Sequence, residues 1–157
     1  MPVIDLMELP AALPPHTPVA GLDIGEKTIG VAVSDLGMRI ASPLALIRRK
    51  KFTEDANALF ALMDERGARG LVIGLPLNMD GTEGPRCQSS RAFARNLIRL
   101  RDMPIAFWDE RLSTAAVERV LIGQADLTRA KRADVVDRAA AGYILQGALD
   151  RLSWARN

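Results

Sequence analysis

The chain has 157 residues, of which 48% are hydrophobic and 25% are charged, and this size and composition fit one globular domain with a buried core. The single cysteine and single histidine exclude an intramolecular disulfide, a zinc site of several thiolates and a multi-histidine metal site. The net charge of +2 permits a nucleic-acid partner without requiring one, and because the sequence shows neither a secretion signal nor a long apolar run, we expect a cytoplasmic protein without a membrane span.

The first 18 residues are interrupted by proline at positions 10, 14, 15 and 18, which predicts an extension rather than a regular element. We therefore expect a proline-rich N-terminal extension over residues 1–18 and one folded domain over residues 19–157. We assign no chemistry to the extension.

Three strands are expected at the start of the domain. Residues 19–25 and 29–35 are runs of branched and small apolar residues on either side of a polar turn, and this pattern predicts a hairpin. A third strand over residues 39–47 follows the turn at residues 35–37. Together these segments predict an antiparallel meander.

Helices and strands then alternate. Thr53 is expected to cap a helix that ends at Gly67 or Gly70. The continuous apolar run over residues 70–75 predicts a strand that is buried on both faces. A helix with apolar residues at helical spacing follows, and residues 104–108 predict a short strand after it.

Two more helices are expected, one capped by Ser113 or Thr114 and ending near Gly123, and one capped by Asp134. The element order is therefore βββ-α-β-α-β-α-α. A meander followed by strands that alternate with helices predicts an α/β fold, with a mixed five-stranded sheet and helices on both faces.

Three acidic residues occupy positions that such a sheet would bring together. Asp23 lies near the end of the first strand, Glu110 follows the last strand, and Asp137 lies in the first turn of the last helix. Clustered carboxylates repel one another and are stabilised by hard cations such as Mg²⁺ or Mn²⁺. Two such ions can activate a water molecule and stabilise the leaving oxygen during phosphodiester hydrolysis.

Each carboxylate also has an ordinary structural interpretation. Asp23 could be a turn carboxylate, Glu110 could form an exposed pair with Arg111, and Asp137 could stabilise a helix N-terminus. Strand alternation places Asp109 and Glu110 on opposite faces, so only one of the two is expected to face a shared site.

Basic residues near these carboxylates are candidates for contact with nucleic acid, because a polyanion that approaches metal ions needs neutralising charge. They are Lys27, Arg111, Lys131 and Arg132. The loop over residues 75–84 is long for a connection between a strand and a helix, and it is a candidate lid with Asn78, Asp80 and Gly81 near its tip.

Residues 25–30 are spaced like a phosphate loop, but they lack its Gly-Lys-Ser/Thr ending and lead into a strand, so a P-loop is excluded. A weaker similarity to the first hairpin of actin-like and sugar-kinase ATPases keeps an ATPase as one alternative.

Four blocks identify a family: VAGLDIGEKTIGVAVSD, LVIGLPLNMDGTEGP, WDERLSTAAVERVL and VVDRAAAGYILQGALD. In this order they resemble the bacterial YqgF family of pre-16S ribosomal RNA nucleases, which are related to Holliday-junction resolvases. The resemblance runs from about Val19 to Leu152. Many members carry a basic residue two places before the last-helix aspartate, where this chain has Val135, with Lys131 and Arg132 further upstream.

The resemblance implies a ribonuclease H-like fold and metal-dependent endonucleolytic cleavage near the 5′ end of the small-subunit ribosomal RNA precursor. The family's three carboxylates fall on Asp23, Glu110 and Asp137, which would hold one or two Mg²⁺ or Mn²⁺ ions. The implied partners are RNA and a ribosomal subunit precursor, with the enzyme as a monomer or homodimer. The alternatives are a resolvase of branched DNA and a non-catalytic nucleic-acid or transcription-associated binding module.

Overall fold

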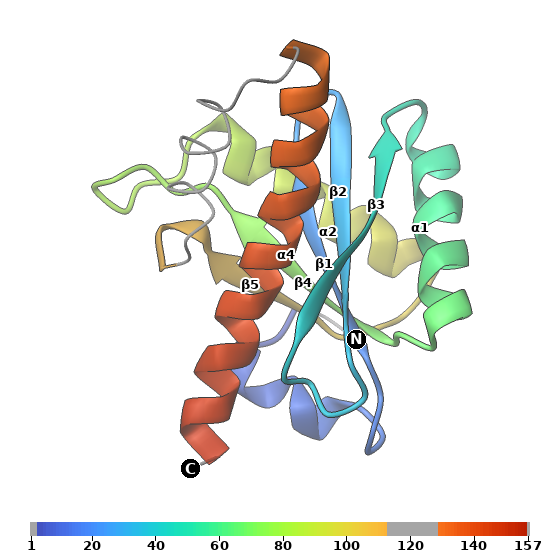
Figure 1. Cartoon of the computed structure of the whole chain (residues 1–157), viewed down its shortest axis with the longest axis vertical. Coiled ribbons are helices and arrows are strands. Elements are labelled where there is room, and N and C mark those ends of the chain that lie inside the picture. Colours follow the sequence, from blue (N-terminus) through green and yellow to red (C-terminus); the bar gives the residue numbers. More distant parts are fainter. Residues whose placement is uncertain (1–2, 113–128, 157) are drawn as a thin grey trace.

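The structure is a computed structural model that describes residues 3–112 and 129–156, with side chains for residues 3–112 and 139–155. A five-stranded sheet in the order β3-β2-β1-β4-β5 forms its centre (Figure 1). The strands are β1 (Val19–Ile24), β2 (Thr28–Ser34), β3 (Ala41–Arg48), β4 (Gly70–Leu75) and β5 (Ile105–Asp109). The mixed α/β sheet predicted from the sequence is confirmed.

Strand direction brings three strand ends to one edge of the sheet. β1 and β2 form an antiparallel hairpin, and β2 pairs in the same way with β3. β4 runs parallel to β1, with Leu22 beside Ile73, and β5 runs parallel to β4, with Ile73 beside Phe107. The carboxyl ends of β1, β4 and β5 therefore lie at the same edge, which is where ligands bind in open sheets with parallel strands.

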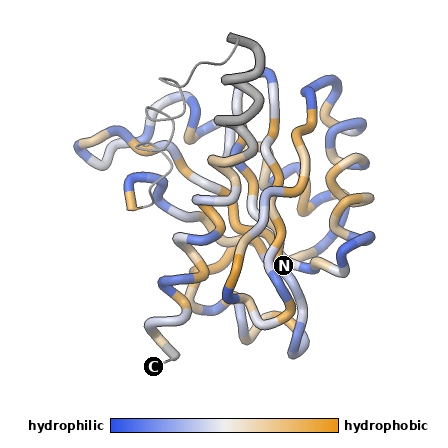
Figure 2. Tube along the Cα trace, in the orientation of Figure 1, coloured by the Kyte–Doolittle hydropathy of each residue, from blue (hydrophilic) through white to orange (hydrophobic). Residues whose placement is uncertain are grey.

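Helices cover both faces of this sheet. On one face lie α1 (Phe52–Arg66) and α2 (Pro85–Leu100), and on the other lies the long α4 (Arg129–Arg156) (Figure 1). Each face has its own apolar core, because β1 and β4 are buried along their whole length. Figure 2 shows the hydrophobic colour concentrated along the strands between the helices. This two-sided burial explains why both strands are nearly continuous apolar runs.

Two predicted helix starts are wrong. The N-cap of α1 is Lys51 and the helix begins at Phe52, so Thr53 lies inside its first turn. The end predicted for this helix is confirmed, because Gly67 adopts the left-handed conformation with φ 73°. α4 begins at Arg129, so Asp134 lies within the helix and does not cap it.

The segment before β1 packs against the folded domain. Its short 3₁₀ helices are η1 (Leu6–Glu8) and η2 (Pro10–Ala12), and Leu9 between them is fully buried at 0% exposure. Val3 forms a bridge to Ile105 beyond the edge of β5. Residues 3–12 therefore contribute to the core on the α4 face and cover an open sheet edge.

The helix predicted from Ser113 or Thr114 to Gly123 lies outside the residues that the structure describes. None of the helices that it does describe combines the length and apolar composition needed to cross a bilayer.

Candidate catalytic site

The carboxyl end of β1 carries Asp23, which is buried with 5% of its surface exposed. The direction of its side chain follows from Gly21, two residues earlier: a Cβ atom added there would lie 2.7 Å from Cβ of Leu145 in α4. Because alternate residues of a strand share a face, Asp23 also points toward the face that α4 covers. A carboxylate buried among apolar strand residues is costly unless an interaction balances it.

Glu110 lies directly after β5, as the first residue of η3 (Glu110–Leu112), and is buried with 7% exposure. A Cβ atom added at Gly74 would lie 3.1 Å from Cγ and 3.2 Å from Cδ of Glu110, and 2.7 Å from Cδ1 of Ile144. The carboxylate group of Glu110 therefore lies over the backbone of β4, on the α4 face, in space that a larger residue at position 74 would fill.

The sheet register brings these two carboxylates to the same place. Leu22 pairs with Ile73, so Asp23 and Gly74 are the next residues along the two neighbouring strands. Asp23 thus lies on the strand beside the glycine over which Glu110 lies. The structure places two of the three predicted acidic residues on one face and at one edge of the sheet.

Asp137 lies within α4, seven residues before Ile144, which is about two helical turns. Figure 1 shows that the N-terminal end of α4 lies at the edge that holds the turn between β1 and β2. The backbone of Asp137 therefore lies between Ile144, which contacts Gly74, and the N-terminal end of α4, and its side chain lies outside the described residues. Among the side chains that are described, no three histidine, cysteine, aspartate or glutamate residues gather at a point.

Asp109 and Arg111 form an ion pair beside this site. Oδ2 of Asp109 accepts from Nη2 of Arg111 at 2.7 Å, and its Oδ1 accepts from the Arg111 backbone amide at 2.9 Å. The hydrogen bonds from the Arg111 side chain hold the pKa of Asp109 below its usual value, against the opposing effect of burial. The carboxylate of Asp109 is thus hydrogen-bonded to Arg111, while the side chain of Glu110 lies over Gly74.

Arg111 also holds the loop between β4 and α2. Its Nη1 donates to the Met79 carbonyl at 3.2 Å, and its guanidinium lies about 3.7 Å from the position of a Cβ added at Gly81. Nothing in the sequence indicates this contact, because residues 79 and 111 are 32 positions apart. The side chain that we expected to contact nucleic acid thus also anchors the candidate lid.

The loop itself has a hydrogen-bonded tip. The Thr82 hydroxyl donates to Asp80 at 2.6 Å, and the side-chain amide of Asn78 donates to Thr82 at 2.9 Å. The bonds from Thr82 hold the pKa of Asp80 below its usual value. Gly81 has φ 89°, a conformation that favours glycine. In Figure 1 the loop extends away from the sheet at the left.

The other predicted phosphate contacts lie near the same edge. Lys27 is exposed in the turn between β1 and β2, and its carbonyl accepts from the backbone amide of Arg49 at 2.8 Å. Lys131 and Arg132 lie in the first turn of α4, and their side chains are outside the described part of the chain. The structure adds Arg49 and Arg86, which line a pocket at the end of β1. Arg49 belongs to the basic run at residues 48–51, whereas no sequence signal marks Arg86.

Comparison with known proteins agrees with this fold. The family model of RuvX, described as Holliday junction resolvase, matches residues 17–151. A protein of Phenylobacterium zucineum named "Putative pre-16S rRNA nuclease" is 71% identical over 153 residues, which are 97% of this chain and 98% of that protein. A protein of Rhodospirillum rubrum with the same name is 63% identical over 156 residues, which are 99% of this chain and 97% of that protein.

Among solved structures, that of T. thermophilus RuvC in complex with a Holliday junction substrate matches 88% of this chain and 97% of its own chain. The TM-score is 0.52 at 13% sequence identity, so the likeness is one of fold. The predicted ribonuclease H-like fold is therefore confirmed. From the family match and the two close relatives we conclude that this chain belongs to the RuvX family, the one that its four sequence blocks resemble under the name YqgF.

Proposed function

We propose that this chain is a metal-dependent endonuclease that hydrolyses a phosphodiester bond of the small-subunit ribosomal RNA precursor, near the 5′ end of the mature RNA. The observation that carries the proposal is the pair of buried carboxylates, Asp23 and Glu110, on one face at the edge where β1, β4 and β5 end. The names of the two close relatives support the choice of substrate.

The residues present fit a divalent cation. Glu110 lies over a glycine that leaves room for its carboxylate, and Asp23 lies on the strand beside it. Buried carboxylates supply the oxygen ligands that Mg²⁺ and Mn²⁺ prefer, and a cation offsets the cost of burying like charges. Asp23, Glu110 and Asp137 would hold one or two such ions.

The chain contributes two things to the reaction, ligands for the ion and contacts to the phosphates. Asp23 and Glu110 are held by the sheet and by the core, so their oxygen atoms need little reordering when an ion binds. A divalent cation, when bound, supplies a water molecule of lowered pKa and stabilises the leaving oxygen. Lys27, Arg111, Lys131 and Arg132 would bind the phosphates of the strand and so orient the bond that is cut.

We also propose that the enzyme works in the cytoplasm, on RNA within a ribosomal subunit precursor, as a monomer or homodimer. The second candidate is a resolvase of branched DNA, because the family description names that activity. Resolvases cut two symmetry-related strands, so that function would require a dimer with both sites on one face.

The two functions are separated by a cleavage assay. Wild type and Asp23→Asn are incubated with Mg²⁺, Mn²⁺ or EDTA and with either a 5′-extended ribosomal RNA precursor or a four-way DNA junction, and the products are mapped. We expect metal-dependent cleavage of the RNA and a rate at least about 100-fold lower in Asp23→Asn, since the loss of a ligand would weaken Lewis-acid stabilisation that is worth several kcal/mol.

Glu65→Gln is the control, because Glu65 is an exposed carboxylate of α1, remote from the site. It should cleave like the wild type. Cleavage of the junction alone would assign the resolvase function. Cleavage that survives both EDTA and Asp23→Asn would refute the proposed site.

A further inference from the structure

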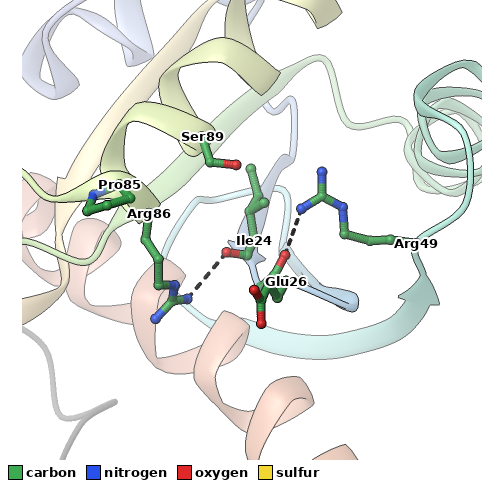
Figure 3. A pocket seen from close by; sticks show the side chains of 7 residues that line it. Ile24, Glu26, Arg49, Pro85, Arg86 and Ser89 are labelled. Carbon is green, nitrogen blue, oxygen red and sulfur yellow. Dashed lines mark hydrogen bonds between the residues drawn. The ribbon is translucent and has the colours of Figure 1, made fainter.

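A second feature lies at the end of β1, on the face opposite to Asp23. It is a pocket of about 250 Å³, and Figure 3 shows the side chains around it. Ile24 faces the core between the sheet, α1 and α2, so the pocket opens on the α2 side of the strand end. Its lining residues are Ile24, Gly25, Glu26, Arg49, Pro85, Arg86 and Ser89.

Two guanidinium groups reach this pocket from separate elements. Nη1 of Arg49, from the segment after β3, donates to the Gly25 carbonyl at 2.7 Å. Nη2 of Arg86, in the first turn of α2, donates to the Ile24 carbonyl at 3.3 Å. Figure 3 shows the two side chains approaching the end of β1 from opposite sides. Each guanidinium retains further N–H donors, because it has five and these bonds use one.

Within the described part of the chain, neither arginine forms an ion pair. Other arginines on the surface do have carboxylate partners. Arg91, for example, donates from Nε and Nη2 to the two carboxylate oxygens of Glu83. The one carboxylate among the pocket's lining residues is the exposed Glu26. The pocket thus has two formal positive charges against one negative charge.

The start of α2 brings no further negative charge to the pocket. Gly84 provides no side-chain cap, and the first turn contains no acidic residue. The first turn instead contains Arg86, although the helix macrodipole disfavours a cation at that end. Pro85 has no amide hydrogen and the Cys87 amide donates to the Gly84 carbonyl at 3.1 Å, so a bound anion would interact chiefly with the two guanidinium groups.

We propose that this pocket binds a phosphate group of the polynucleotide, next to the phosphate that is cut, through Arg49 and Arg86. The inference rests on the proposed function. Ile24 directly follows Asp23, so the pocket and the carboxylates lie on the two faces of one strand end. A polynucleotide that crosses this edge of the sheet reaches the carboxylates with one phosphate and the pocket with a neighbouring one.

The test measures binding of a labelled RNA oligonucleotide that spans the 5′ end of the mature 16S sequence, in EDTA so that no cleavage occurs. The variant is Arg86→Gln, because Arg86 is exposed and its loss should leave the fold intact. The control is Arg99→Gln, the same change at an exposed arginine in the last turn of the same helix. Melting temperatures of all three proteins check folding.

We expect Arg86→Gln to bind the RNA about threefold to tenfold more weakly and to lower the slope of log affinity against log salt by about 0.7, as for one lost contact to a single strand. Arg99→Gln should match the wild type. A set of oligonucleotides, each with one phosphate replaced by a neutral methylphosphonate, locates the contacted phosphate. At that position the wild type and Arg86→Gln should bind with equal affinity.

Other outcomes overturn the proposal in distinguishable ways. Equal binding by Arg86→Gln and Arg99→Gln would remove the pocket from the substrate path and leave the proposed function standing. ATP binding is measured for the same proteins. If Arg86→Gln loses ATP binding and keeps its affinity for RNA, the pocket binds a free nucleotide instead. Failure of the wild type to bind both the RNA and a four-way DNA junction would overturn the pocket and the proposed function together.

Discussion

The position of Glu110 depends on the absence of a side chain at Gly74. A Cβ atom there would lie 3.1 Å from Cγ of Glu110, closer than ordinary contact, and 2.7 Å from Cδ1 of Ile144. An alanine at position 74 must therefore push both neighbours away. Because a metal ligand must be held within about 0.5 Å, a small displacement of this carboxylate is expected to matter more for activity than for stability.

We predict that Gly74→Ala lowers the free energy of unfolding by about 1–3 kcal/mol and lowers the cleavage rate by more than the loss of folded protein explains. Gly21→Ala is the matched control, since its Cβ would meet Leu145 at 2.7 Å without touching Glu110. Urea denaturation and single-turnover cleavage measure the two effects. Equal activity per folded molecule in the two variants would contradict this role of Gly74.

The turn between β2 and β3 shows how a single charge contributes to stability. Oδ1 of Asp35 accepts from the backbone amides of Ile40 at 3.0 Å and Arg39 at 2.8 Å. These bonds hold the pKa of Asp35 below its ordinary value of 3.8 in the folded chain. The stabilisation from this lowered pKa is present above the unfolded pKa and is lost as pH falls through the folded pKa.

Asp35→Asn should therefore lower the free energy of unfolding at pH 7 by an amount of the order of 1 kcal/mol or less, because the side chain is exposed. The difference between the variant and the wild type should shrink as the pH falls below 3.8. Urea denaturation over a pH series measures it. A difference that grows toward low pH would contradict the assignment.

At the residue scale, Asp109 pairs with Arg111 and Glu110 lies over Gly74. Glu110 follows β5 as the first residue of η3, so the opposite faces that strand alternation assigns to the two residues stay a prediction. The contact between Arg111 and the Met79 carbonyl could not be predicted, because it depends on how a loop folds over the end of a different strand. The roles of Asp23, Glu110 and Asp137 as metal ligands stay a prediction.

At the level of the element, the loop between β4 and α2 is tied to the end of β5 by Arg111. We predict that Arg111→Ala speeds amide hydrogen exchange over residues 76–84 and changes global stability little, as is usual for ion pairs at the surface. Arg101→Ala, which breaks the exposed pair with Asp64, is the control and should leave this loop unchanged. Equal exchange in both variants would show that Arg111 does not order the loop.

The element starts that sequence reasoning placed wrongly have a common physical cause. Thr53 and Asp134 are good capping residues, but a residue caps a helix only where its own backbone is extended. Helix α4 is already helical from Arg129, five residues before Asp134, and α1 starts at the extended Lys51 without a side-chain cap. Strands β1 and β4 could be predicted from the sequence, because a strand that is buried on both faces is apolar at nearly every position.

Across the whole molecule, the N-terminal segment is part of the core on the α4 face. Leu9 is completely buried there, a burial that the prolines of this segment do not reveal. We predict that Leu9→Ala lowers the free energy of unfolding by about 2–4 kcal/mol, because a buried leucine leaves a cavity. Met7→Ala, at a position 41% exposed, should cost much less. Equal melting temperatures for the two variants would mean that the segment does not stabilise the domain.

The whole fold brings distant carboxylates to one edge, and we propose that Glu110 on the α4 face, rather than its neighbour Asp109, binds the metal ion. The most direct test is calorimetric titration of Mn²⁺ into the full chain as wild type, Glu110→Gln and Asp109→Asn. We expect the wild type and Asp109→Asn to bind Mn²⁺, and Glu110→Gln to bind it at least about tenfold more weakly. Retained affinity in Glu110→Gln, or absence of Mn²⁺ binding to the wild type, would contradict it.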